Sequence, residues 1–170
     1  MGGSRRIDPV TLSIAAGPYR LRPTRASDRA GIIKAGQSPA IGGKMPWFPS
    51  PFPDHYADGW IARALSTWGG GQHWLLSVVG FDDRYLGSVV LSRLTDGRFE
   101  LAYWVVPEEE GRGVASAAAR AMIDWSRLTL NPSGYVAKAR LDNHASRRVL
   151  HKTGFAETGE SNGAMSYALD

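Results

Sequence analysis

Three apolar-rich runs follow one another in the middle of the chain, over residues 73–79, 84–94 and 98–106. Two short stretches of turn-forming residues separate them, GFDD at 80–83 and DG at 96–97. Apolar runs of this length, bounded by Gly and Asp, are typical of β-strands joined by hairpins. The pattern therefore predicts three consecutive antiparallel strands.

The hydrophobic period changes after Pro107. Apolar residues then recur at steps of three and four, as on one face of an α-helix: Val114, Ala118, Ala121, Met122 and Trp125. Asn131-Pro132 predicts the end of this helix. Beyond it, the pattern predicts a strand over 135–141, a short helix over 145–152 and a final strand pair over 155–169.

The first third of the chain is less regular. Glycines and other small residues in segment 1–16 offer little to bury, which predicts a flexible N-terminal leader. A short strand is expected over 19–22, followed by helices over 28–37 and 56–68. A Pro- and Gly-rich segment, residues 38–54, connects these two helices.

The order of these elements, β-α-α-β-β-β-α-β-α-β-β, decides the fold class. A strand meander followed by crossover helices predicts a mixed, mostly antiparallel sheet of about six or seven strands, with about four helices on its two faces. A chain of 170 residues is long enough for one domain with a substantial core. We therefore expect an α/β (α+β) fold in which residues 17–170 form a single domain.

The composition excludes several classes of protein. There is no cysteine, so disulfides, thiolate metal sites and a cysteine nucleophile are excluded. No run approaches the roughly 18 apolar residues that span a bilayer, and no secretory signal is recognisable, so a cytoplasmic protein without a membrane partner is expected. The net charge of +4 favours an anionic ligand, but no interleaved aromatic and basic motif indicates nucleic acid. Both a monomer and a homodimer fit the sequence.

A glycine-rich loop precedes the helix predicted after Pro107. Gly111 and Gly113 flank Arg112, so the backbone there can approach a ligand closely. The free N–H groups of the first helical turn and the helix dipole then favour an anion. The loop is not a Walker loop, because no Gly-Lys-Ser/Thr follows. Taken alone, it is also explained as a turn that only starts a helix.

A second notable segment follows a predicted strand near the C-terminus. Asn143 is placed to cap a short helix, Ser146 lies on the first turn of that helix, and Gly154-Phe155 follows its end. Asn is a favoured N-cap, so an ordinary capped helix also explains this segment when it is taken alone.

Together, and in this order, the segments resemble the GNAT acetyltransferase superfamily, and within it the branch that acetylates the N-termini of ribosomal proteins. The resemblance covers about residues 18–169. It rests on LRP at 21–23 with Asp28, MPW at 45–47, Trp60-Ile61, Gly87, ELAYW at 100–104, GRGVA at 111–115, and Asn143 with Ser146 through Gly154-Phe155. It implies a GNAT-type fold, acetyl-CoA as the cofactor with coenzyme A as the product, and a primary amine as the acceptor.

The resemblance also implies which residues hold the cofactor. The loop would wrap the coenzyme diphosphate, the strand that ends at Val106 would splay from its neighbour and pair with the pantetheine arm, and Asn143 would bond that arm from the other side. The cofactor-binding residues expected are Trp104, Val105, Val106, Glu110, Gly111, Arg112, Gly113, Val114, Ala115, Ser116, Asn143 and Ser146.

One residue of the loop departs from the family pattern. Glu110 stands where the family has Gln or Arg, and a carboxylate beside a diphosphate is unfavourable unless it points away. Arg112, Arg147 or Arg148 could offset this negative charge.

Amide formation requires a neutral amine. At pH 7 roughly a tenth of an α-amine is neutral, and far less of a lysine amine, so a base typically contributes about 10²–10⁴-fold. Glu100 is the predicted base, because the two-residue strand period places it on one face with Ala102 and Trp104. A solvated strand glutamate is the alternative.

The departing thiolate needs a proton or a hydrogen bond. Many family members place a tyrosine where this chain has Leu150. The resemblance implies that Ser146 serves instead, and a role in capping the helix is the alternative. A backbone N–H near Val105 would stabilise the oxyanion. The predicted catalytic residues are therefore Glu100 and Ser146.

The acceptor site is expected beside an aromatic segment. Trp47, Phe48 and Tyr56 would form a wall for a peptide or a hydrophobic small molecule, and packing of the two helices on the sheet is the alternative. No metal is predicted, because the four histidines lack ligand spacing: His55, His73, His144 and His151.

Two other functions stay open. Leu150 and Glu110 depart from the family pattern, so a GNAT-fold module that holds acyl-CoA without turnover is one alternative. The same fold could also use another donor, such as aminoacyl-tRNA. The main prediction is acetyl transfer to a protein N-terminus or to a small-molecule amine.

Overall fold

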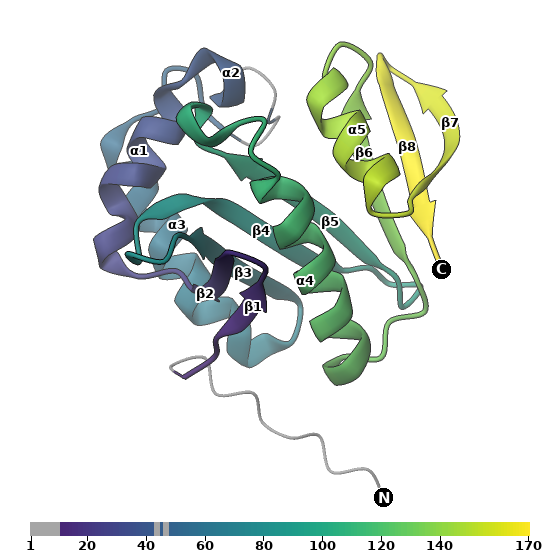
Figure 1. Cartoon of the computed structure of the whole chain (residues 1–170), viewed down its shortest axis with the longest axis horizontal. Helices are drawn as coiled ribbons and strands as arrows, with labels where there is room; N and C mark the ends of the chain where they lie inside the picture. Colours follow the sequence, from purple (N-terminus) through teal and green to yellow (C-terminus); the bar gives the residue numbers. More distant parts are fainter. Residues whose placement is uncertain (1–10, 43–44, 46–47) are drawn as a thin grey trace, which may run out of the picture.

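The structure is a computed structural model that describes residues 11–42, 45 and 48–170. Within these residues the chain forms a sheet of eight strands in the order β1-β2-β3-β4-β5-β6-β8-β7 (Figure 1). All neighbouring strands are antiparallel except β5 and β6, which are parallel. The strands are β1 (Ile14–Ala16), β2 (Tyr19–Pro23), β3 (His73–Val79), β4 (Tyr85–Arg93), β5 (Phe99–Val105), β6 (Tyr135–Arg140), β7 (Ala156–Ser161) and β8 (Ala164–Leu169).

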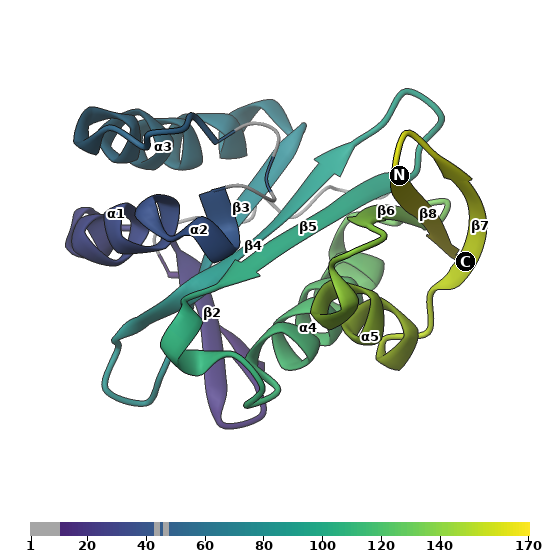
Figure 2. The same cartoon turned by 90° about the horizontal axis from the view of Figure 1, so that it is seen from above.

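Helices cover both faces of this sheet. Figure 2 shows α1, α2 and α3 on one side, with α4 and α5 on the other. The described helices are α1 (Arg29–Gln37), α2 (Pro39–Gly42), α3 (Asp54–Thr67), α4 (Val114–Thr129) and α5 (His144–Lys152). The predicted mixed, mostly antiparallel sheet with helices on its two faces is thus confirmed, and α2 is a short addition inside the Pro- and Gly-rich segment.

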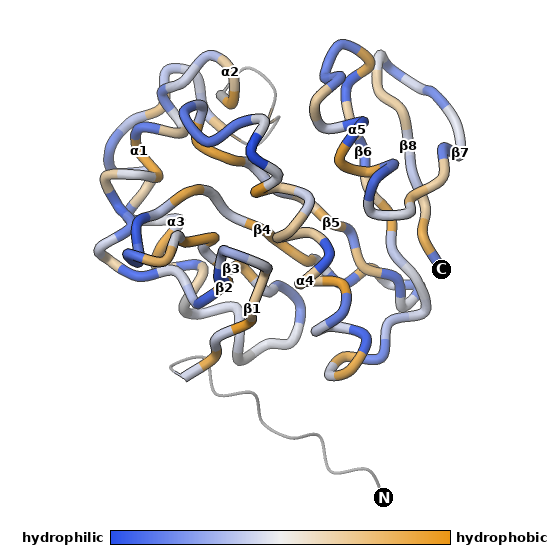
Figure 3. Tube along the Cα trace, viewed as in Figure 1, coloured by the Kyte–Doolittle hydropathy of each residue, from blue (hydrophilic) through white to orange (hydrophobic). Residues whose placement is uncertain are grey.

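Alternating side chains of the meander build two hydrophobic cores, one on each face. On β3, Leu76 packs into the core beneath α4, whereas Leu75 packs into the core beneath α1 and α3. Helix α4 has the predicted buried stripe, and the tube of Figure 3 changes repeatedly between orange and blue along it. Ala118 and Met122 on this helix are fully buried, whereas Arg120 is exposed.

Strand β1 lies in the segment predicted as a leader. Of residues 1–16, residues 1–10 lie outside the described part, but Ile14 pairs with Leu21 and Ala16 pairs with Tyr19. Ala16 is 4% exposed, and Ile14 packs against the core beneath α4. The sheet therefore begins before residue 17, because even a short strand of small residues gains hydrogen bonds and burial from a neighbouring strand.

Strands β5 and β6 separate soon after they meet. Their parallel pairing comprises Phe99 with Tyr135 and Glu100 with Val136. Beyond these pairs β5 continues along β4, while β6 continues along β8. The result is a wedge between the C-terminal halves of β5 and β6, as expected from the resemblance.

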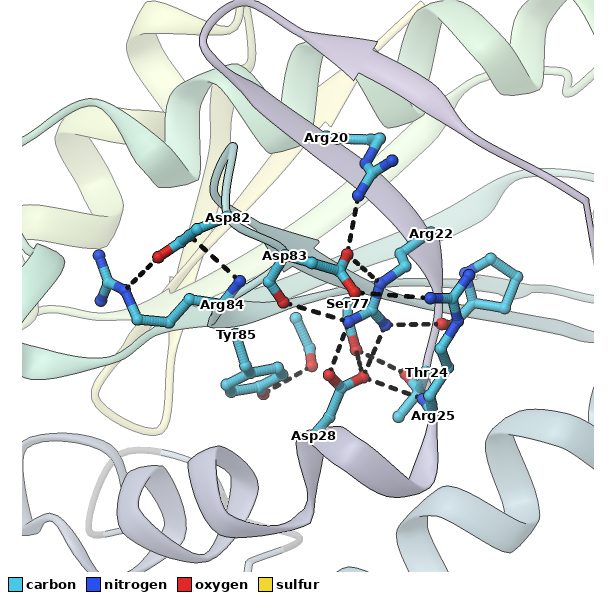
Figure 4. A network of polar contacts seen from close by, with 12 residues as sticks. Arg20, Arg22, Thr24, Arg25, Asp28, Ser77, Asp82, Asp83, Arg84 and Tyr85 are labelled. Carbon is cyan, nitrogen blue, oxygen red and sulfur yellow. Dashed lines mark hydrogen bonds and ion pairs between the residues drawn. The ribbon is translucent and has the colours of Figure 1, made fainter.

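A buried polar network ties β2, the start of α1, β3 and the β3–β4 turn together (Figure 4). Both oxygens of Asp28 accept hydrogen bonds from the guanidinium of Arg22 at 2.9 Å, and each side chain is 2% exposed. Asp28 also accepts from Ser77 Oγ at 2.7 Å and from the backbone N–H of Arg25 at 2.9 Å. Asp83 receives the Nε–H of Arg22 at 2.8 Å. The Asp28 carboxylate is thus fully hydrogen-bonded in spite of its burial.

Candidate active site

A cavity of about 210 Å³ opens beside the wedge, where three segments meet. These are the C-terminal half of β5, the loop that leads into α4, and one face of α5. Ten residues predicted to bind the cofactor line it: Trp104, Val105, Glu110, Gly111, Gly113, Val114, Ala115, Ser116, Asn143 and Ser146. Local motifs that are far apart in the sequence are therefore brought to one place.

The loop before α4 takes a conformation that requires glycine. Gly111 and Gly113 have φ angles of 76° and 81°, in the left-handed region that other residues disfavour. Gly113 is the N-cap of α4, and the first bond of the helix runs from Ala117 N–H to the Gly113 carbonyl. The N–H groups of residues 114–116 therefore lack helical acceptors and lie at the cavity wall. This arrangement can hold an anion.

The charged groups around the loop differ from the expectation. Arg112 turns to the buried Glu109, at 3.3 Å, and is not among the residues that line the cavity. Arg147 pairs with Glu157 at 3.1 Å. Of the three predicted cations only Arg148 lines the cavity, and it is joined there by Lys152. Glu110 also lines the cavity and is exposed, so its carboxylate has access to water.

The positive charge from α5 follows a helical pattern. Ala145, Arg148, Val149 and Lys152 recur at steps of three and four, so they share one face of α5, and all four line the cavity. Lys152 was not predicted from the sequence. The periodicity contained the signal, but the direction of that face depends on how α5 packs against α4.

Within the part of the chain that the structure describes, the edge of β5 that faces the wedge has backbone groups without a strand partner. Phe99 N–H donates to the carbonyl of Gly134, on the β6 side, at 3.0 Å, whereas Val106 N–H donates to Leu86, on the β4 side, at 2.8 Å. Backbone groups of an antiparallel strand alternate between its two edges. Tyr103 and Val105 therefore present their N–H and C=O groups to the wedge, beyond the last pair with β6.

Two of the predicted strand residues contribute little side-chain surface. Val106 is 5% exposed and packs beneath α1 and α3, so it is not among the cavity residues. The indole of Trp104 is buried on that same face, where its N–H donates to Tyr85 Oη at 2.9 Å. On β4, Gly87 lies so close to the Trp104 carbonyl that any Cβ at this position would collide with it. Glycine therefore permits this course of β5.

Asn143 and Ser146 have separate roles at the start of α5. Asn143 is the N-cap, and its Oδ1 accepts from Ser146 N–H at 3.2 Å. The Ser146 hydroxyl instead lies 3.1 Å from the hydroxyl of Tyr103, which also donates to the Ser146 carbonyl at 3.1 Å. Ser146 Oγ is therefore not the helix cap, and it remains at the cavity wall.

Tyr103 is a site residue that sequence reasoning missed. Burial raises the pKa of its hydroxyl far above the ordinary value, and the hydrogen bond with Ser146 only partly opposes this rise. The phenol therefore stays protonated at neutral pH and donates to the backbone carbonyl of Ser146. Strand alternation could have placed Tyr103 on the face of Leu101 and Val105, but its contact with α5 arises from the tertiary fold.

Glu100 occupies the point at which β5 and β6 separate. It is exposed, and it lines a second cavity of about 200 Å³ that fills the wedge. Ser146 and Asn143 line this wedge cavity as well as the first one. The two predicted catalytic side chains thus border one space, although they come from β5 and α5.

The predicted aromatic wall divides into packing and cavity residues. Trp47 lies outside the described residues. Phe48 is 6% exposed and packs edge-on against Phe52, Trp60 and Trp104, so the packing alternative describes it. Tyr56 lines a third cavity, on the α3 side of the sheet, together with Glu100.

Among the described residues there is no cluster of three or more His, Asp or Glu side chains that could hold a metal ion. In the same part of the chain, no helix combines the length and the apolar character needed to cross a membrane.

Comparisons with known proteins agree with this geometry. The family model described as "Acetyltransferase (GNAT) domain" matches residues 19–156. A curated relative from Bacillus subtilis (strain 168), named "Putative ribosomal N-acetyltransferase YdaF", is 30% identical over 83 residues. That alignment covers 48% of this chain and 45% of the relative, so it spans less than half of the relative's length.

Solved structures show the same fold. RimJ from Mycobacterium smegmatis, in complex with CoA-disulfide, has a TM-score of 0.79 at 20% identity, over 95% of this chain and 88% of that chain. The microcin C7 self-immunity acetyltransferase MccE, in complex with acetyl-CoA and AMP, has a TM-score of 0.76 at 16% identity, over 89% and 91% of the two chains. With a family model that matches most of its length, this chain belongs to the GNAT acetyltransferase family.

Proposed function

We propose that this protein transfers an acetyl group from acetyl-CoA to a primary amine, on a protein N-terminus or on a small molecule. One arrangement carries the proposal: an anion site at the start of α4, an open edge of β5, and Glu100 and Ser146 on the wedge between them. Family membership supports it. The RimJ and MccE structures, which contain forms of coenzyme A, support the choice of cofactor.

The residues of the first cavity suit coenzyme A in three ways. The backbone at Gly111 and Gly113 and the first turn of α4 offer N–H groups to a diphosphate. Arg148 and Lys152 add positive charge from α5. The free edge of β5 offers donors and acceptors to an amide-containing chain. Bound acetyl-CoA would supply the thioester carbon that the amine attacks.

Glu100 is suited to remove a proton from the acceptor. Its carboxylate borders the wedge cavity and the cavity on the α3 side, so an amine that enters from that side passes it. The exposed carboxylate can take the proton of an ammonium group directly or through water. This raises the fraction of neutral amine at the point of attack.

The Val105 N–H and the Ser146 hydroxyl are suited to act on the oxygen and the sulfur of the thioester. The N–H of Val105 points from the β5 edge into the wedge and can donate to the carbonyl oxygen as negative charge develops there. Ser146 Oγ can donate to the leaving sulfur when its hydroxyl hydrogen turns toward the cavity and away from Tyr103 Oη, 3.1 Å away. Because Tyr103 donates its single hydroxyl hydrogen to the Ser146 carbonyl, its oxygen can accept from Ser146 Oγ and hold the serine at the cavity wall.

The names of the relatives bear on the acceptor. YdaF is named as a ribosomal N-acetyltransferase, which supports a protein N-terminus. MccE was solved with AMP as well as acetyl-CoA, which supports keeping small molecules in the test.

Two measurements on the same preparation test the proposal. Calorimetry should show binding of coenzyme A, and a thiol-release assay with acetyl-CoA should show turnover on some member of a panel of peptides and small amines. Binding without release across the panel would favour the non-catalytic alternative. Thiol release with another acyl-CoA but not with acetyl-CoA would show that the protein uses a different acyl donor. Absence of coenzyme A binding would overturn the proposal.

A further inference from the structure

The cavity on the α3 side of the sheet is separate from the predicted coenzyme site. It has a volume of about 210 Å³. One wall is a single face of α3, in which Tyr56, Trp60, Arg63 and Thr67 recur at helical spacing. The opposite wall comes from β3, β4 and β5 and includes Glu100 at its inner end, next to the wedge.

This cavity has two opposite charges that do not pair with each other. Among the described residues, neither Arg63 nor Glu100 has a side-chain hydrogen bond or ion pair. Several exposed arginines elsewhere are paired, as Arg29 is with Asp58 at 2.7 Å and Arg140 with Asp142 at 2.9 Å. Arg148 at the first cavity resembles Arg63 in having no ion pair among the described residues. The cavity therefore offers a free cation and a free anion to one ligand.

A third polar group in this wall lacks a partner. The indole N–H of Trp60 is buried and has no hydrogen-bond acceptor among the described residues. Buried donors are almost always paired in folded proteins. Two other polar groups of this cavity already have a hydrogen-bond partner, because His73 Nδ1 and Ser92 Oγ lie 3.0 Å apart.

We propose that this cavity selects acceptors in which a carboxylate lies close to the reacting amine, an inference that rests on the proposed function. The ammonium group is attracted to Glu100, and the carboxylate is attracted to Arg63. A basic group at the carboxylate position would be repelled by the guanidinium. Two kinds of acceptor carry an ammonium group with a carboxylate close to it: a peptide with an acidic residue near its N-terminus, and a free amino acid.

Competition between matched peptides tests this selection. Three C-terminally amidated peptides should differ only in their second residue, Glu, Gln or Lys, and free glutamate should be assayed beside them. For the wild-type protein we expect kcat/KM to be about tenfold or more higher with the Glu peptide than with the Lys peptide. Turnover of free glutamate above the Glu peptide would identify the amino acid as the source.

Arg63→Glu reverses the proposed recognition. Arg63 is exposed and has no ion pair within the described part of the chain, and Glu is a good helix former, so the variant is expected to fold. The ratio of kcat/KM for the Glu and Lys peptides should fall by about tenfold or more and should favour Lys. Arg127→Glu, an exposed change of equal charge on α4 at a residue that lines none of the three cavities, is the control and should keep the wild-type ratio.

Calorimetric titration of the same peptides into the protein loaded with coenzyme A gives a readout without turnover. Tighter binding of the Glu peptide, lost in Arg63→Glu, supports the inference even if the acyl donor differs from acetyl-CoA. Equal turnover or binding of the Glu and Lys peptides would overturn the inference and leave the proposed function intact. A preference that survives Arg63→Glu would also overturn it, because other cations would then be responsible.

Discussion

At the scale of single residues, the hydroxyl of Ser146 is separated from the capping role that a helix start often gives to serine. Asn143 caps α5, while Ser146 Oγ contacts Tyr103. Ser146→Ala should therefore lower kcat by about tenfold or more with little loss of coenzyme affinity, and steady-state thiol release with calorimetry measures both. Tyr103→Phe should reduce the rate less, because the serine donor remains. A destabilised but fully active Ser146→Ala would contradict the role in proton donation.

Glu100 is expected to act through its charge. In Glu100→Gln, kcat/KM at pH 7 should fall by about 10²-fold, because the amine loses its proton acceptor while the side chain keeps its shape. The deficit should shrink as pH rises through about 8, where an α-amine deprotonates unaided. A pH profile of the variant beside Glu160→Gln, an exposed change on β7, measures this. A deficit that does not depend on pH would indicate a structural role.

At the scale of elements, the start of α4 should decide coenzyme binding. Gly113→Asp places a carboxylate at the proposed diphosphate site, so the dissociation constant for coenzyme A should rise by about 100-fold or more. Gly163→Asp is the matched control, because Gly163 has a similar φ of 72° and equally open surroundings in the β7–β8 turn. Calorimetry on both folded variants decides the assignment. Unchanged affinity for coenzyme A in Gly113→Asp would contradict the assignment of this loop to the diphosphate.

Elements whose signal is local could be predicted from the sequence. The meander followed from continuous apolar runs because β3 and β4 are buried on both faces along most of their length. The glycine loop and Asn143 followed from backbone requirements at single positions. Strand β1 was missed, since three residues become a strand only through the neighbouring β2. The burial of Phe48, the turn of Arg112 toward Glu109, and the contact of Tyr103 with Ser146 all depend on how distant elements pack.

At the scale of the whole molecule, the pair of Arg22 and Asp28 joins strand β2 and the start of α1 to strand β3, where Ser77 donates to Asp28. Asp28→Asn removes the fully buried counter-charge of the Arg22 guanidinium and leaves it the partly exposed Asp83, so the free energy of unfolding should fall by about 3 kcal/mol. Urea denaturation measures the loss. Asp58→Asn removes the partner of Arg29 in an exposed pair and should change stability little. Equal effects of the two substitutions would contradict the importance of burial.

Because β5 separates from β6, the C-terminal half of β5 has no neighbouring strand on its wedge side among the described residues. Exposed strand edges readily accept a further strand, and an extended ligand that pairs with Tyr103 and Val105 would fill this place. The amide protons of these two residues should then exchange with deuterated solvent faster than those of Trp104 and Val106, which bond to β4. Added coenzyme A should slow their exchange and raise the melting temperature with its concentration. The ligand would then be a removable part of the sheet.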